Sequence, residues 1–128
     1  MAKSPLLRSF GYAFKGFKAA YTERNFKLHL VSASLAIITG FVSQLSVVQW
    51  CIILICIAGV LTLELINTAL EHLVNLVSPE YNETAGKVKD ISAAAVLCFS
   101  IASFIIALII FIPRLYALYF DPVYACQG

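Results

Sequence analysis

The chain has 128 residues, of which 61% are hydrophobic and 12% charged, about half the charged share of an ordinary soluble domain. This composition excludes a soluble enzyme of ordinary design, and the length allows one domain, residues 1–128. No charged residue occurs between His29 and Glu64, or between Asp90 and Arg114. Both gaps are long enough for membrane spans of about 20 residues. The sequence therefore predicts an integral membrane protein.

Basic residues are concentrated ahead of the first long apolar stretch. There are six of them, against a single acidic residue, Glu23. They are Lys3, Arg8, Lys15, Lys18, Arg24 and Lys27. Because positively charged segments stay on the cytoplasmic side, we expect a multi-pass membrane protein with a cytoplasmic N-terminus. No nucleic-acid partner is expected, since the bases are spread along an amphipathic helix beside membrane segments.

Residues 1–27 predict an interfacial helix and the entry to the first span. Large apolar side chains recur there at steps of three and four residues, and the basic residues fall on or beside the other face. The apolar set is Leu7, Phe10, Phe14, Phe17 and Tyr21. A basic helix with an aromatic-rich apolar side lies in the bilayer interface rather than across it.

Three apolar stretches predict transmembrane helices over residues 28–48, 49–77 and 91–112, which makes the fold class all-α. Ser78-Pro79 is expected to end the second helix, and residues 78–90 form a hydrophilic connection. Pro113 and Arg114 are expected to close the third helix, and residues 113–128 form a tail without an assigned function. Three spans place the N-terminus and the 78–90 connection on the same, cytoplasmic side.

A stripe of polar residues interrupts the second predicted span. Its members fall within a sector of about 100° on a helix that advances about 100° per residue. They are Glu64, Asn67, Thr68, Glu71 and Asn75. A charged side chain near mid-bilayer costs several kcal/mol, so a bound cation, a reaction or a transported ion is needed to explain two carboxylates on one face.

The three spans bring the acidic residues to one side of the membrane. Glu23 and Glu71 suit the oxygen coordination of Mg²⁺, which typically binds one or two carboxylates together with substrate phosphates. Glu64, set deeper and drier, suits a general base acting on a hydroxyl group. Asn67 is placed to orient either partner.

Lys89 and Asp90 follow the polar connection and offer a phosphate contact and a second acceptor. No glycine-rich phosphate loop of the GxxxxGK[ST] or GxGxxG type is present, but phosphoryl transfer needs mainly positioning and charge neutralisation. Spacing alone fits three functions: catalysis, a small oligomeric proton-coupled transporter with Glu64 as proton relay, and hydrogen bonding between spans.

Several motifs closely resemble those of the prokaryotic diacylglycerol kinase family, which includes the undecaprenol kinases. The resemblance covers about residues 8–112, in order and almost without gaps. The matching segments are Gly11-Tyr12-Ala-Phe-Lys15-Gly16, Thr22-Glu23-Arg24-Asn25, Glu64-Leu-Ile-Asn67-Thr68-Ala-Leu-Glu71, Glu80-Tyr81, and Lys89-Asp90-Ile-Ser-Ala-Ala-Ala-Val96-Leu97.

The resemblance implies ATP- and Mg²⁺-dependent phosphorylation of the hydroxyl of a membrane lipid, either undecaprenol or diacylglycerol, in phospholipid or cell-wall carrier-lipid metabolism. It also implies a homotrimer with active sites shared between neighbouring subunits. By position, Glu64 matches the catalytic base, Asn67 a site residue beside it, and Glu23 and Glu71 the metal ligands. Further positions match the nucleotide-binding residues. These are Tyr12, Glu80, Tyr81, Asn82, Lys89 and Asp90.

Two positions depart from the pattern of many relatives. Asn75 stands where they carry Asp, and Asn82 where they carry His. Both positions lie near the nucleotide in the family, so we expect an effect on ATP affinity or nucleotide preference. The run from Glu23 to His29 is more similar to the undecaprenol kinase branch.

Overall fold

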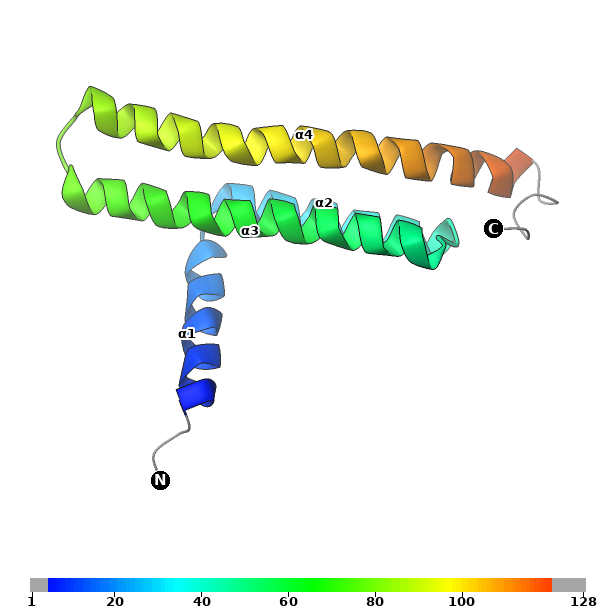
Figure 1. Cartoon of the computed structure of the whole chain (residues 1–128), viewed down its shortest axis with the longest axis horizontal. Helices are drawn as coiled ribbons and strands as arrows, with labels where there is room; N and C mark the ends of the chain where they lie inside the picture. The colour runs from blue at the N-terminus through cyan, green and yellow to red at the C-terminus, as the bar shows by residue number, and fades with distance from the viewer. Residues whose placement is uncertain (1–4, 121–128) are drawn as a thin grey trace.

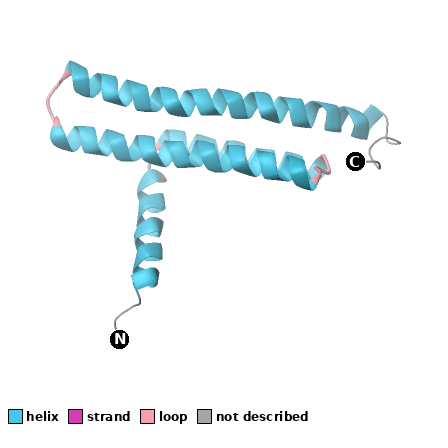
Figure 2. Ribbon diagram, viewed as in Figure 1, coloured by secondary structure: helices cyan, strands magenta, loops and turns pink. Residues whose placement is uncertain are grey.

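The computed structural model describes residues 5–120, and this range consists of four α-helices joined by short connections, without strands (Figures 1 and 2). The helices are α1 (Pro5–Ala20), α2 (Arg24–Val42), α3 (Val47–Val77) and α4 (Glu83–Phe120). The predicted all-α fold class is confirmed.

Helices α2, α3 and α4 lie side by side, whereas α1 projects sideways from them (Figure 1). Helix α3 is central and packs against both α2 and α4. By length and composition, α2, α3 and α4 are each able to cross a membrane. If these three helices cross the bilayer, α1 runs along its surface, as a basic helix with an apolar aromatic side requires.

Residues 43–46 connect α2 to α3 and shorten the first predicted span. Helix α2 ends at Val42 rather than at residue 48, because Gln44 adopts a left-handed backbone conformation with φ of 50°. Ser46 then caps α3: the Gln49 N–H donates to its hydroxyl at 3.4 Å, and the Ser46 N–H donates to Gln49 Oε1 at 3.0 Å.

The apolar core lies close to this connection. Leu45, Ile53 and Ile110 are buried there and join all three long helices. Gly40 lets α2 approach closely, since a Cβ atom at this position would lie 2.7 Å from Cη2 of Trp50. The apolar core thus occupies one end of the bundle, and the polar stripe lies towards the other.

Helix α4 begins at Glu83 rather than at residue 91, so the predicted hydrophilic connection over 78–90 is wrong in its second half. The Asn82 side-chain oxygen accepts hydrogen bonds from the backbone N–H groups of Thr84 (2.9 Å) and Ala85 (3.1 Å), which starts the helix. Lys87 then pairs with Glu83 one turn earlier at 2.7 Å. Local capping outweighs the polarity of the segment.

Helix α4 also continues through Pro113 to Phe120, so the prediction that Pro113 and Arg114 close the third helix is wrong. Proline removes one helical hydrogen bond, but contacts made by residues after Pro113 stabilise the continuing helix. Arg114 Nε donates to Gln49 Oε1 at 3.1 Å, and the Tyr116 and Phe120 rings stack at 5.0 Å. The rest of the predicted tail, residues 121–128, lies outside the described residues.

Candidate active site

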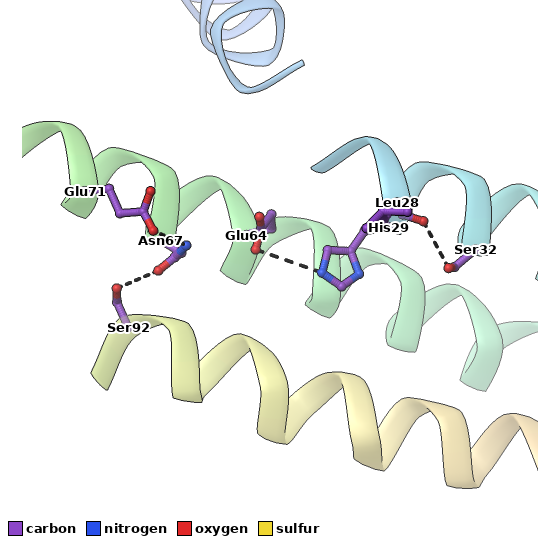
Figure 3. Close-up of polar contacts among 7 residues, drawn as sticks. All are labelled: Leu28, His29, Ser32, Glu64, Asn67, Glu71 and Ser92. Carbon is purple, nitrogen blue, oxygen red and sulfur yellow. Dashed lines mark hydrogen bonds and ion pairs between the residues drawn. The ribbon is translucent and has the colours of Figure 1, made fainter. Parts of the chain in front are cut away.

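Three members of the polar stripe of α3 are buried where the N-terminal turns of α2 and α4 meet it, whereas Asn75 is exposed. Only 3% of Glu64, 5% of Asn67 and 7% of Thr68 is exposed, while Glu71 is half-buried. Figure 3 shows Glu64, Asn67 and Glu71 along one side of α3, facing residues of α2 and α4. A cluster of buried polar side chains requires partners, because an unpaired buried polar group is costly.

Asn67 has a partner on each side. Its Nδ2 donates to Glu71 Oε1 at 3.3 Å, and its Oδ1 accepts from the Ser92 hydroxyl at 2.6 Å (Figure 3). The Ser92 oxygen is also 2.9 Å from the carbonyl oxygen of Lys89. The amide of Asn67 is therefore held in one orientation by two different helices, and one oxygen of Glu71 is fixed as a result.

Glu64 faces a histidine from the neighbouring helix. His29 Nε2 on α2 lies 4.0 Å from Glu64 Oε2 (Figure 3). Glu71 lies two turns further along the same face of α3, and His72 beside it lies 4.0 Å from Glu23 at the start of α2. The structure thus places the three predicted acidic residues at the same end of the bundle, although Glu23 and Glu71 are far apart in sequence.

Glu23 lies at the connection between α1 and α2, and its Oε1 is 4.0 Å from Nε2 of His72 on α3. Within residues 5–120, no three histidine, cysteine, aspartate or glutamate side chains converge to form a preformed metal site. Mg²⁺ needs no such group, since it retains waters and binds one or two carboxylates plus substrate phosphates. Glu23 and Glu71 fit that requirement in number and chemistry.

The other predicted nucleotide-binding residues lie at the end of the bundle where α3 passes to α4. Lys89 Nζ donates to Asn75 Oδ1 at 2.6 Å, which holds the ammonium group against α3. Glu80, Tyr81 and Asp90 are exposed. Asn82 also lies there, but its side-chain oxygen caps α4 as described above.

Tyr12 is separate from this group. It lies on the projecting helix α1, with 68% of the residue exposed, and the ammonium of Lys15 lies 5.8 Å from its ring centroid. In Figure 1, α1 leaves the bundle partway along α3, away from the connection to α4. One chain therefore does not bring Tyr12 together with Tyr81.

An apolar groove of about 440 Å³ lies between α1 and α3. Its α3 wall includes Thr68 and His72, which flank Glu71, and its α1 wall includes Gly16 and Phe17. Thr68 lies one turn from Glu64 on the same helix. The groove therefore lies one helical turn from Glu64, and none of the three acidic residues is among those that line it.

Sequence reasoning missed three side chains of this site. It assigned no site role to His29, His72 or Ser92, whereas the structure places each beside a predicted site residue. Comparing the expected depths of residues in the membrane could have identified His29. It precedes the α2–α3 connection by about as many residues as Glu64 follows it, so an antiparallel pair brings the two to similar depth.

The fold and site define a helical protein with three helices able to cross a membrane and a carboxylate-rich site at one end of its bundle. The sequence model described as prokaryotic diacylglycerol kinase matches residues 11–111. Two relatives exceed 30% identity. Undecaprenol kinase of Bacillus subtilis (strain 168) is 43% identical over 109 residues, 84% of this chain and 89% of the relative. Diacylglycerol kinase of Synechocystis sp. is 36% identical over 115 residues, 88% of this chain and 66% of the relative.

Diacylglycerol kinase of Escherichia coli (strain K12) is also similar, at 29% identity over 93 residues, covering 72% of this chain and 76% of the relative. The chain belongs to the prokaryotic diacylglycerol kinase family. It is therefore a lipid kinase, and the choice between catalysis and transport that spacing left open is decided for catalysis.

Proposed function

We propose that this protein transfers the γ-phosphoryl group of Mg-ATP to the hydroxyl of a membrane lipid alcohol, with undecaprenol as the preferred acceptor. The observation that carries the proposal is the buried carboxylate of Glu64, which lies one turn from Thr68 in the wall of an apolar groove and two turns from Glu71 on the same face of α3. The greater identity to an undecaprenol kinase than to diacylglycerol kinases supports the acceptor. The product, a lipid phosphate, belongs to carrier-lipid or phospholipid metabolism.

Glu64 is the general base in this proposal. With 3% of the residue exposed, its carboxylate is shielded from water and lies close to apolar surface that suits a lipid chain. As the lipid oxygen bonds to the γ-phosphorus, Glu64 accepts the hydroxyl proton. The bond from the γ-phosphorus to its bridging oxygen breaks, and the electron pair leaves with ADP.

Glu23 and Glu71 would hold Mg²⁺, whose charge offsets that of the phosphates. The hydrogen bond from Asn67 occupies Oε1 of Glu71 and leaves Oε2 for the metal. Lys89 contacts a phosphate, with its ammonium group placed by Asn75. Asn67 thus orients a metal ligand rather than acting on the lipid itself.

We further propose a homotrimer with sites shared between subunits, in the bacterial inner membrane with the N-terminus and the site facing the cytoplasm. Separation of Tyr12 from the α3–α4 connection supports sharing, since nucleotide-binding residues from both places would then come from different subunits. Many large apolar side chains along α2, α3 and α4 are exposed in the single chain. The basic N-terminal segment supports the orientation.

The test is a phosphorylation assay with purified protein in mixed micelles, labelled ATP, and undecaprenol or diacylglycerol. We expect labelled lipid phosphate that requires Mg²⁺, with a higher kcat/KM for undecaprenol. A higher kcat/KM for diacylglycerol would overturn the acceptor and leave the chemistry intact. No phosphorylated lipid with either acceptor would contradict the proposed function.

A further inference from the structure

Because Glu64 is buried, the proton that it accepts in each cycle needs a route to solvent, and none of the roles above provides one. In each cycle a general base receives one proton and must lose it before the next lipid can react. A carboxylic acid that is 3% exposed exchanges poorly with bulk water. A titratable side chain that is close to Glu64 and also reaches solvent would supply the missing route.

His29 meets both conditions. Its Nε2 lies 4.0 Å from Glu64 Oε2, and 23% of its side chain is exposed in the single chain, against 3% for Glu64. His29 also lies in the second turn of α2, near the proposed cytoplasmic surface. Figure 3 shows the imidazole ring of His29 reaching from α2 across to Glu64 on α3. Histidine changes charge most readily near neutral pH, which makes it suited to receive and release a proton within one turnover.

Among the described residues around Glu64, His29 is the only titratable side chain that is free to accept its proton. The electrostatic neighbours of Glu64 are His29 from α2, Glu71 from its own helix and Glu23 from the α1–α2 connection. Neither Glu71 nor Glu23 is free to accept the proton of Glu64, since both are proposed to bind Mg²⁺ during turnover. From α4, the polar residue facing this part of α3 is Ser92, which donates to Asn67.

We infer that His29 is a proton relay that returns Glu64 to its basic form after each phosphoryl transfer. The inference rests on the proposed role of Glu64 as general base. The Glu64 O–H bond breaks and its proton passes to His29 Nε2, either directly after a small side-chain movement or through one bridging water. The imidazolium side chain then moves back and releases that Nε2 proton to solvent, which leaves Nε2 free to accept again in the next cycle. One proton, taken from the lipid hydroxyl, leaves per lipid phosphate formed.

Replacing the proton relay and replacing the general base should affect different turnovers. Glu64 is needed in the first turnover, whereas His29 is needed only to prepare the second. We therefore expect H29Q, which keeps a polar side chain of similar reach but cannot carry the proton, to form one lipid phosphate per site at near the wild-type rate. Later turnovers should be slower by about 10²-fold, within the usual contribution of a proton-transfer group.

The experiment is rapid-quench phosphorylation with saturating Mg-ATP and undecaprenol, followed through the first and later turnovers. The variants are wild type, H29Q, H29A and the control S32A. Ser32 lies one turn further along α2, and its hydroxyl bonds only within its own helix, to the Leu28 carbonyl at 3.0 Å. S32A should behave as wild type, and imidazole added to H29A should restore later turnovers at least several-fold.

The outcomes separate the relay from the base. A wild-type protein that forms no lipid phosphate overturns the proposed function and the relay together. With an active wild type, the relay alone is overturned if H29Q keeps the wild-type steady rate, or if its first and later turnovers slow equally. Failure of imidazole to restore H29A would likewise assign His29 a structural role.

Discussion

The Ser92 hydroxyl lies 2.6 Å from the side-chain oxygen of Asn67, and this contact joins the start of α4 to the buried stripe of α3. Through Asn67 it reaches Glu71, whose Oε1 accepts from the same amide at 3.3 Å. The geometry of a proposed metal ligand thus depends on a residue in another helix. Such supporting hydrogen bonds typically change metal affinity or activity by about 10–100-fold when removed.

Replacing Ser92 should therefore weaken the use of Mg-ATP more than the chemical step. We expect S92A to raise the KM for Mg-ATP by about 10-fold, while S92T, which retains the hydroxyl, stays near wild type. The measurement is initial rate against Mg-ATP concentration at saturating lipid. S100A is the matched control on the same helix, because the buried Ser100 hydroxyl has no hydrogen-bond partner. Equal effects of S92A and S100A would contradict the prediction.

Lys89 gives a second prediction, on nucleotide affinity. Its ammonium group contacts the neutral side chain of Asn75 at 2.6 Å, so N75D would place a carboxylate there and compete with the phosphates for the same charge. An exposed ion pair is worth about 0.2–1 kcal/mol, which corresponds to a rise in the KM for ATP of about 1.4- to 5-fold. E83Q, which removes the Lys87–Glu83 pair two residues away, serves as control and should leave KM unchanged. A lower KM in N75D would show that the charge of Lys89 is not used for phosphate binding.

Gly40 gives a prediction about the fold rather than the site. A methyl group there would lie 2.7 Å from Cη2 of Trp50, so G40A must displace the indole ring. Overpacking of this kind costs about 1–3 kcal/mol of stability. Trp50 is the single tryptophan of the chain, so unfolding in denaturing detergent and the indole emission spectrum both report the change. G11A is the control, since no atom lies within 4 Å of the added methyl group. An unchanged spectrum and midpoint for G40A would contradict the packing described for α2 and α3.

The sequence predicts those parts of the molecule that depend on local pattern. The polar stripe on α3 and the all-α class both follow from the periodicity of apolar and polar residues. The course of α4 does not, because the Asn82 cap and the anchoring of Arg114 by Gln49 outweigh the polar segment before residue 91 and the proline at 113. The Asn82 cap is a local signal that the polarity of the segment obscures. The contact between Arg114 and Gln49 joins residues far apart in sequence and depends on the packing of α4 against α3.

The same distinction explains which site residues were found. Glu64, Asn67 and Glu71 share one helix, so spacing alone groups them. His29, His72 and Ser92 each belong to a pair formed between different segments of the chain. Spacing along one helix does not reveal these pairs, which form only when α2, α4 and the α1–α2 connection pack against α3.

The central claim is that two glutamates on one helix do different work: Glu64 acts on the lipid hydroxyl and Glu71 on the metal. The most direct test compares E64Q and E71Q in two measurements, Mg-ATP binding and kcat for undecaprenol phosphorylation. We predict that E64Q binds Mg-ATP as wild type does and loses about 10²–10⁴-fold in kcat, the range for a general base. E71Q should weaken Mg-ATP binding as well. Equal, mild effects of the two substitutions on both quantities would contradict the account.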